Sequence, residues 1–186
     1  MSDQSLEISL RVNSQEVNAQ VPVRMHLAEF LRESMDLTGS HLGCEYGACG
    51  ACQVHVDGLL VRGCTTLAVQ AQGKHVETVE GLTEKGVLRE LQNAFLKHNA
   101  FQCGFCSSGM LITALEITNH YPNADREQIR DLISGNYCRC TGYQSIVDAI
   151  ESVLKDQRLR NQLNALVGQA LSTPSVKAQS EMGVDK

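Results

Sequence analysis

The sequence predicts an α+β protein of two small domains, the first built on strands and the second on helices. Apolar and polar residues alternate through much of the chain up to about Val79, whereas apolar residues recur at helical spacing from about Val87 onward. The eight cysteines divide into two groups of four, one group in each segment. A chain of 186 residues has room for one large or two small domains, and the cysteine grouping favours two.

The first domain, residues 1–82, is expected to be a sheet covered by one helix. Leu6–Val12 and Val17–Val21 each alternate apolar with polar residues across a short polar segment, which predicts two antiparallel strands. Leu27–Met35 changes to helical spacing, and Gly39 follows as a stop signal. This helix is expected to cover one face of the sheet.

A second hairpin is expected after the helix. Gln53–Val56 and Leu59–Val61 have the pattern of paired strands, and the Asp57-Gly58 pair between them is typical of a tight type I′ turn. We expect two further apolar stretches to close the sheet and a glycine to end the domain: Thr65–Val69, Val76–Val79 and Gly81.

The second domain, residues 83–158, is expected to contain four helices, because each of four segments has an apolar face. The second helix should begin with Ser107 or Ser108 as its N-cap. The third should begin at Asp125, where Gln128 completes a capping box. The four predicted segments are Val87–His98, Met110–Thr118, Asp125–Ile133 and Ile146–Leu154.

The remaining residues, 159–186, are expected to form a polar tail that is partly disordered. Leu159, Leu163, Leu166 and Val167 are spaced as in an amphipathic extension of the helical domain. After Leu171 the composition is polar, and we expect disorder there.

Composition limits the partners and the location. The formal net charge is −5, and no run of basic residues occurs, so nucleic acid is not an expected partner. The N-terminal residues Met1–Glu7 have neither a basic region nor an apolar core of a signal peptide. No segment approaches the length of a membrane span. We therefore expect a cytoplasmic protein with no membrane span.

The first cysteine group has the spacing of an iron-sulfur site. Cys44, Cys49 and Cys52 follow the pattern C-x4-C-x2-C, which together with a later fourth cysteine, here Cys64, is the plant-type [2Fe-2S] spacing. The intervening loop is rich in glycine, and Gly43, Gly47 and Gly50 can take positive φ and leave backbone N–H groups free to point at an anionic cluster. A zinc site is the main alternative.

The second cysteine group is ambiguous by itself. Cys103 and Cys106 form a C-x-x-C pair, which also suits a thioredoxin-like dithiol or half of a zinc site. Cys138 and Cys140 add two thiols from a separate loop, and a set of four thiolates suits zinc and iron-sulfur equally. Disulfides are disfavoured because an unexported protein sits in a reducing compartment. The spacing therefore leaves the metal open.

Three stretches resemble the small iron-sulfur subunit of the molybdenum hydroxylases, the family of xanthine dehydrogenase, aldehyde oxidoreductase and aerobic carbon monoxide dehydrogenase. They are Gly43–Cys52, Gln102–Met110 and Gly135–Tyr143, and the resemblance extends from about Leu6 to Leu154. It implies a ferredoxin-like β-grasp domain followed by a four-helix bundle that binds a second [2Fe-2S] cluster. One departure is Ser108, where the family more often has proline.

The resemblance also implies the function. Enzymes of this family pass electrons from a molybdopterin centre through the helical-domain cluster and then the ferredoxin-like cluster to FAD. Gln102 and Cys140 match the family positions that contact the pterin. The ligands of the molybdenum-proximal cluster would be Cys103, Cys106, Cys138 and Cys140, and those of the flavin-proximal cluster Cys44, Cys49, Cys52 and Cys64.

The implied partners are a large molybdopterin subunit, with the cofactor as its cytosine dinucleotide, and a medium FAD subunit, assembled as a dimer of heterotrimers. This chain would be the iron-sulfur subunit of the oxidoreductase and would carry no substrate chemistry and no catalytic residue, because it has no Gly-rich phosphate loop, Ser/His/Asp set or paired carboxylates. Two other functions are alternatives: a stand-alone dithiol oxidoreductase using Cys103 and Cys106, and a zinc-stabilised interaction module. The six histidines show no paired metal spacing and are interpreted as surface or packing residues.

Overall fold

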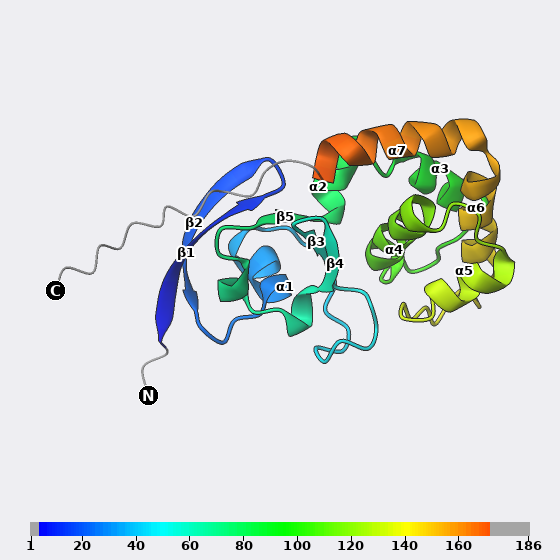
Figure 1. Ribbon diagram of the computed structural model, residues 1–186. Coiled ribbons are helices and arrows are strands. Elements are labelled where there is room, and N and C mark those ends of the chain that lie inside the picture. Colours follow the sequence, from blue (N-terminus) through cyan, green and yellow to red (C-terminus); the bar gives the residue numbers. More distant parts are fainter. Residues whose placement is uncertain (1–3, 172–186) are drawn as a thin grey trace.

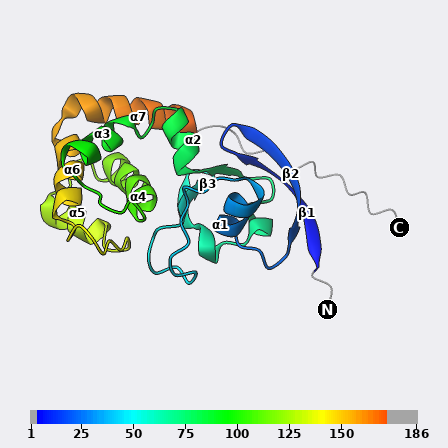
Figure 2. The same cartoon turned by 180° about the vertical axis from the view of Figure 1, so that it is seen from behind.

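The structure, a computed structural model, describes residues 4–171, and in it a sheet part and a helical part lie side by side (Figure 1). Five strands form one mixed sheet with the order β2-β1-β5-β3-β4. Seen from behind, the two parts keep the same relation, with α2 between them (Figure 2). The strands are β1 (Ser5–Val12), β2 (Gln15–Pro22), β3 (Gln53–Val56), β4 (Leu59–Arg62) and β5 (His75–Glu77).

Both predicted hairpins are confirmed. Strands β1 and β2 pair antiparallel from Ser5 opposite Pro22 to Val12 opposite Gln15. Strands β3 and β4 pair antiparallel, and between them Asp57 and Gly58 have φ values of 49° and 76°, as a type I′ turn requires. Each hairpin therefore forms from residues adjacent in sequence, and the turn chemistry fixes its register.

Strand β5 joins the two hairpins into one sheet. It pairs parallel with β1, where Val12 lies opposite Val76, and antiparallel with β3, where Val56 also lies opposite Val76. The chain then enters the next helix at once, because Thr78 is the N-cap residue of α2 (Val79–Glu84). The central strand of the sheet thus leads directly into the helical part.

The predicted helix over one face of the sheet is confirmed, with a change of winding inside it. Helix α1 (Leu27–Glu29) continues as a π-helical turn, Phe30–Ser34. The His26 side chain caps the start, since its Nδ1 accepts a hydrogen bond from the Glu29 N–H at 2.9 Å. Phe30 and Leu31 are fully buried in the core of the sheet part.

The predicted strand Thr65–Val69 is wrong. This segment spans the end of one 3₁₀ turn, Gly63–Thr65, and the first half of another, Ala68–Ala71, and makes only an isolated bridge between Leu67 and His26. The hydroxyls of Thr65 and Thr66 both donate to the Arg62 carbonyl, at 3.2 and 3.1 Å, and such local bonds compete with a strand ladder.

Gly81, the glycine expected at the end of the first domain, lies inside α2. A Cβ atom at this position would lie 2.2 Å from Asn13 Oδ1, so the helix can approach the turn between β1 and β2 only with a glycine here. The sequence signal was correct in marking a special residue, but the cause is close packing and not a chain stop.

The helical part contains the four expected helices and an additional one. Asp125 and Gln128 form the predicted capping box of α5. The predicted serine N-cap of α4 is wrong, because Cys106 is the N-cap residue and Ser107 and Ser108 lie in the first turn. The helices are α3 (Arg89–Lys97), α4 (Ser107–His120), α5 (Arg126–Leu132), α6 (Gln144–Lys155) and α7 (Gln157–Leu171).

Helix α7 occupies the first part of the segment expected as a polar tail. It runs along the outside of the helical part and ends near α2 (Figure 1), and its Leu163 and Ala170 are buried in the helical core. The disorder expected after Leu171 lies outside the described residues. Within the described residues, no helix is long and apolar enough to cross a membrane.

Candidate metal centres

The first cysteine group comes together at the edge of the sheet part nearest the helices. Cys44, Cys49 and Cys52 lie on the loop that precedes β3, drawn in cyan in Figure 1, and Cys64 lies in the 3₁₀ turn that follows β4. Cys52 is 2% exposed and Cys64 is 7% exposed. The β3–β4 hairpin therefore brings the fourth thiol back to the loop that carries the other three.

Backbone N–H groups converge on the first thiol of this loop. Burial acts to raise the pKa of Cys44, but hydrogen bonds from the backbone of Cys49, Tyr46 and Ala48 outweigh it and lower the pKa to about 6. The N–H of Cys49 lies 3.4 Å from Cys44 Sγ. These N–H groups stabilise a negative charge on the Cys44 sulfur. The anionic cluster predicted from the sequence would require such stabilisation.

The glycines of the loop have two different roles. Gly47 and Gly50 have φ of +84° and +78°, as expected for residues that turn N–H groups inward. Gly43 was expected to do the same, but it is not among the residues with positive φ. A Cβ there would lie 3.1 Å from Cys49 Sγ and 3.2 Å from Phe105 Cε1, so its small size makes room for a thiol and for the neighbouring loop.

The four thiols of the first group are neighbours in two pairs. Burial, followed by the hydrogen bond and charge of the Cys52 thiol, raises the pKa of Cys64 to about 11, and the charge of Cys44 adds to this. Cys44 in turn interacts with Cys49. The pairs are therefore Cys44 with Cys49 and Cys52 with Cys64.

The second group comes together at the ends of three helices. Cys103 precedes α4 and Cys106 caps it, while Cys138 and Cys140 lie on the loop between α5 and α6. Cys103 Sγ and Cys140 Sγ are 3.6 Å apart, and both residues are exposed. A cavity of about 270 Å³ lies over these thiols, lined by Gln102, Cys103, Gly104, Phe105, Cys106, Tyr137, Cys138, Arg139 and Cys140.

These thiols also form two pairs. Burial, followed by the hydrogen bond and charge of the Cys138 thiol, raises the pKa of Cys106 to about 12. The pKa of Cys140 is raised chiefly by its hydrogen bond with Cys103. The pairs are Cys106 with Cys138 and Cys103 with Cys140. Each pair takes one thiol from the segment that leads into α4 and one from the loop between α5 and α6.

In the second group, a side-chain hydroxyl helps to stabilise negative charge on a thiol. In the first group, backbone N–H groups do this. Burial acts to raise the pKa of Cys138, but the Thr141 hydroxyl, 3.1 Å from the sulfur, and the backbone of Thr141 and Cys140 outweigh it, so the pKa is lowered. The Cys138 N–H donates to the Tyr143 hydroxyl at 2.9 Å. No spacing signal in the sequence predicts these roles of Thr141 and Tyr143, although both lie in Gly135–Tyr143, one of the three stretches that carry the resemblance.

The arrangement of thiols fits a two-iron cluster in each group. A [2Fe-2S] cluster with four cysteine ligands places two thiolates on each iron, and both groups consist of two thiol pairs. Among the described residues, no three His, Cys, Asp or Glu side chains are gathered as the ligands of a single ion would be. The donor set, four sulfur atoms in each group, is also the one that iron-sulfur clusters use.

Gln102 lies at the rim of the second group. Its Nε2 donates to the Cys140 carbonyl at 3.1 Å, and both residues are exposed. The structure therefore brings together, on an exposed face, the two residues for which the family resemblance implies a pterin contact.

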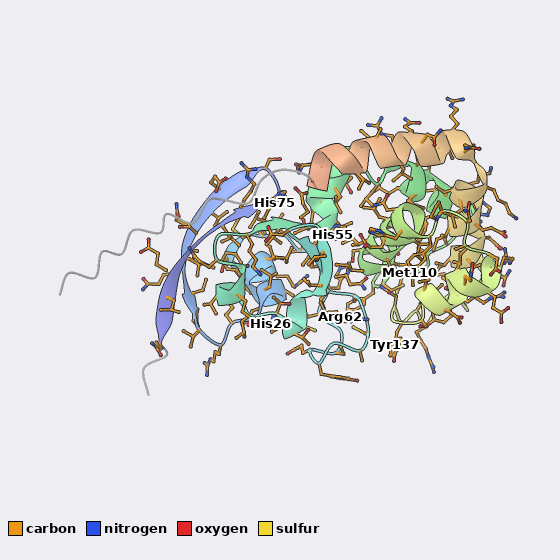
Figure 3. The ribbon with its side chains drawn as sticks, viewed as in Figure 1. His26, His55, Arg62, His75, Met110 and Tyr137 are labelled. Atoms are coloured by element: carbon orange, nitrogen blue, oxygen red, sulfur yellow. The ribbon has the colours of Figure 1, made fainter. Side chains whose placement is uncertain are left out.

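The two groups approach each other at the junction of the two parts. The Tyr137 N–H donates to the Cys49 carbonyl at 2.9 Å, so a cysteine of one group is bonded to the neighbour of Cys138 in the other. Arg62 Nη2 donates to the Gly135 carbonyl at 3.0 Å. Figure 3 shows Arg62 and Tyr137 close together at this junction, one on each part. Nothing in the spacing of the sequence marked Arg62 as a contact residue.

Two of the six histidines, predicted as surface or packing residues, are buried packing residues, and each contacts a glutamate. His55 on β3 is fully buried and faces Glu116 on α4, with Nε2 2.8 Å from Oε1. His75 lies 2.7 Å from Glu77, which also contacts Lys85. These pairs hold the sheet part against α4 and fix the passage from β5 into α2.

Two family models together match most of the chain. A model described as "2Fe-2S iron-sulfur cluster binding domain" matches residues 10–83, and one described as "[2Fe-2S] binding domain" matches residues 78–151. The first match contains most of the sheet part and its four cysteines, and the second contains the other four.

Curated and solved relatives agree with these matches. The chain is 50% identical over 149 residues to caffeine dehydrogenase subunit gamma from Pseudomonas sp. (strain CBB1), covering 78% of this chain and 89% of the relative. It is 37% identical over 161 residues to the aldehyde oxidoreductase iron-sulfur-binding subunit PaoA of Escherichia coli (strain K12), covering 78% and 70%. The crystal structure of quinoline 2-oxidoreductase from Pseudomonas putida 86 contains a chain that matches with TM-score 0.76 and 43% identity, covering 87% of this chain and 98% of that one.

Proposed function

The chain belongs to the family of small [2Fe-2S] subunits of the molybdenum hydroxylases, and from that premise we propose that it relays electrons from a molybdopterin centre on one partner subunit to FAD on another. Its class is shown by the comparisons: it is an iron-sulfur subunit of an oxidoreductase complex. The route through two clusters, and the residues that hold them, are the content of the proposal.

The observation that carries the proposal is the pairing of thiols in two separate groups. We propose that Cys44 with Cys49 and Cys52 with Cys64 bind one cluster, because their sulfurs are neighbours in the structure. Cys103 with Cys140 and Cys106 with Cys138 would bind the other for the same reason. The first group would belong to a β-grasp domain, residues 1–82, and the second to a four-helix bundle, residues 83–158.

The exposure of the thiols supports an order along the relay. Cys103 and Cys140 are exposed at a cavity whose rim carries Gln102, so a cofactor on a partner subunit can approach the second group closely. We therefore assign Gln102 and Cys140 as the pterin contact and the second group as the molybdenum-proximal centre. The first group would then pass electrons on toward FAD.

When bound, each cluster takes up and releases one electron. The residues of this chain tune that exchange by the hydrogen bonds they donate to sulfur, which stabilise negative charge and raise the potential. Backbone N–H groups do so at Cys44, and the Thr141 hydroxyl does so at Cys138. Two centres with different donors and different burial would differ in potential, which allows them to act in series.

The assembly follows from the family. We propose a large subunit carrying molybdopterin cytosine dinucleotide, a medium subunit carrying FAD, and a dimer of such heterotrimers. Its relatives are named as a subunit of caffeine dehydrogenase and as an iron-sulfur-binding subunit of aldehyde oxidoreductase, which supports a complex. The cysteines must stay reduced until they bind metal, which supports a cytoplasmic location, since that compartment keeps thiols reduced.

The test is spectroscopy on the complex as it co-purifies. We expect two [2Fe-2S] clusters per copy of this chain by iron and acid-labile sulfide analysis, and two distinct EPR signals together with Mo(V) after reduction by dithionite. Fewer than two clusters per chain, or a colourless protein that contains zinc, would contradict the proposal.

A further inference from the structure

A buried polar network lies at the junction of the two parts, away from the thiols themselves. Asn136, Gln53 and Thr113 are 2%, 6% and 5% exposed. Asn136 Nδ2 donates to Gln53 Oε1 at 2.9 Å, and Thr113 Oγ1 lies 2.6 Å from Gln53 Oε1 and 2.9 Å from Asn136 Oδ1. Most buried polar side chains have at least one hydrogen-bond partner, and here the three residues provide partners for one another.

Each member of the network belongs to a segment that carries cysteines. Gln53 follows Cys52 in the first group, and Asn136 stands two residues before Cys138 in the second. Thr113 lies on α4, which begins directly after Cys106. The network therefore connects the cysteine loop of the sheet part with both cysteine segments of the helical part.

The backbones of these segments are in direct contact beside the network. A Cβ at Gly50 would lie 2.6 Å from the Gly135 carbonyl oxygen and 2.7 Å from Asn136 Nδ2. The Asn136 amide also lies 3.4 Å from the Gly50 carbonyl oxygen. Beside this contact, the N–H of Tyr137, which follows Asn136, donates to the carbonyl of Cys49, which precedes Gly50. Asn136 thus sits where it can hold that hydrogen bond in place.

We propose that Asn136 is a positioning residue for electron transfer between the two centres. It anchors the loop of Cys138 to the loop of Cys49 and keeps the Tyr137–Cys49 backbone hydrogen bond formed, so that the separation and the bonded route between the centres stay fixed. The inference rests on the proposed two-cluster relay and adds to it a residue that contacts no substrate or cofactor.

The chemistry of the site requires an amide at this position. Asn136 donates to Gln53 and to the Gly50 carbonyl, and it also offers an acceptor to Thr113. An aspartate of the same shape lacks the N–H donors and places a charge among carbonyl oxygens, and an alanine lacks both functions. Thr113 gives a milder way to disturb the same network, because valine has its shape without the hydroxyl and serine keeps the hydroxyl.

The experiment compares Asn136→Ala, Thr113→Val and Thr113→Ser with the unchanged chain in the co-purified complex. Asn123→Ala is the matched control, because Asn123 is exposed and lies on the loop between α4 and α5. Iron and sulfide content establish that both centres are loaded. Three measurements then follow: the rate of electron transfer between the centres after rapid partial reduction, the magnetic coupling between the two reduced EPR signals, and the hydrogen exchange of the Tyr137 amide.

With both clusters present, we expect Asn136→Ala to slow transfer between the centres several-fold, because the rate of electron tunnelling falls steeply when a bonded contact is lost and the separation grows. Its Tyr137 amide should exchange faster and its magnetic coupling should weaken. Thr113→Val should change the same three quantities in the same direction by less, while Thr113→Ser and Asn123→Ala should leave them unchanged.

The outcomes separate the inference from the proposed function. If the Asn136→Ala variant loses a cluster, the same three measurements on Thr113→Val test the inference instead. A loaded variant that keeps the transfer rate, the coupling and the protection of the Tyr137 amide would overturn the role of Asn136. A wild-type complex with fewer than two clusters, or with no transfer between them, would instead overturn the relay itself.

Discussion

The two cysteine groups hold the same four-thiol set in opposite ways. The first takes three cysteines from one glycine-rich loop and a fourth from the turn after a hairpin, and two of its members, Cys52 and Cys64, are buried. The second takes two cysteines from each of two loops at helix ends, and its Cys103 and Cys140 are exposed. The first group is therefore closed by its own loop, whereas the second is open on one side.

The supporting hydrogen bonds differ in the same sense. Backbone N–H groups lower the pKa of Cys44 to about 6 against the effect of burial, and they depend on a loop conformation that glycines allow. At Cys138 the Thr141 hydroxyl contributes most to the lowering. The charge on the first centre is thus stabilised mainly by backbone N–H groups, and that on the second partly by a side chain that can be replaced. The electrostatic surroundings of the two centres can therefore be changed independently.

The largest effect should come from removing one thiol in each group. We expect Cys52→Ser to abolish the EPR signal of the first centre and leave the second, and Cys106→Ser to do the reverse, because each cluster needs its full ligand set. Each variant is the control for the other. If either one abolished both signals, the two groups would not be independent centres, and the comparison would fail.

A large effect is also expected at the contact between the first cysteine loop and α4. A Cβ at Gly109 would lie 2.1 Å from the Gly50 carbonyl oxygen, so Gly109→Ala should destabilise the chain by about 1–3 kcal/mol through overpacking. Gly168→Ala is the matched control, since it is a helical glycine with nothing within 4 Å of the added Cβ.

The control should stabilise by up to about 1 kcal/mol, which is the helix-propensity difference between glycine and alanine. Thermal unfolding followed by circular dichroism measures both changes. Equal effects at the two glycines would show that the groups are not held in backbone contact at Gly50.

A comparable effect, which depends on pH, is expected where β5 passes into α2, outside both groups. Burial acts to raise the pKa of Glu77, but hydrogen bonds from His75 and Lys85 outweigh it and hold the pKa below its ordinary value of 4.5. Because the folded pKa is depressed, the stabilisation is full above pH 4.5 and is lost as the pH falls through the folded pKa.

Glu77→Gln should therefore cost about 1–3 kcal/mol at neutral pH, the range for a buried hydrogen-bonded group left without its partner. The cost should shrink in acid. Denaturation midpoints against pH, with the exposed Glu84→Gln as control, measure it. Since Glu77 serves neither centre alone, both cluster absorbances should be lost at the same lowered temperature.

The smallest effect is expected at the start of α5, which leads into Cys138. The Asp125 carboxylate accepts the Gln128 N–H at 2.9 Å, and replacing such an N-cap by alanine costs about 1 kcal/mol. Asp131→Ala, at the other end of the same helix, should not destabilise it. Hydrogen exchange should show Asp125→Ala loosening the second group and not the first, and equal loosening of both would contradict their separate support.

The parts of the fold that the sequence could predict are those that depend on patterns of residues close together in the chain. The two hairpins, the helix over the sheet and the capping box at Asp125 each depend on residues close in sequence, so alternation, spacing and turn chemistry suffice. The cysteine spacing C-x4-C-x2-C is local in the same way. The pairing of Cys103 with Cys140 needs the fold, because the two thiols come from different loops.

The parts that sequence could not predict depend on contacts across the junction. Gly81 stands beside Asn13, Arg62 reaches Gly135, and His55 meets Glu116, all between residues distant in the chain. Asn136 lies inside one of the three stretches that carry the resemblance. Sequence spacing cannot tell whether a residue near a ligand cysteine forms hydrogen bonds across the junction or faces solvent. One feature of Thr113 indicated a hydrogen-bonding role: it is a polar residue on a helix whose other residues are mostly buried.

The position of β5 determines when the chain can fold. The two hairpins form locally, but they share no edge until β5 inserts between β1 and β3, and its pairing with β1 closes a long loop, which is the slow kind of contact. During synthesis, the loop of Cys44–Cys52 would leave the ribosome before its sheet could be complete. Any fragment that ends between Cys64 and His75 holds all four cysteines of the first group but lacks the strand that unites the sheet.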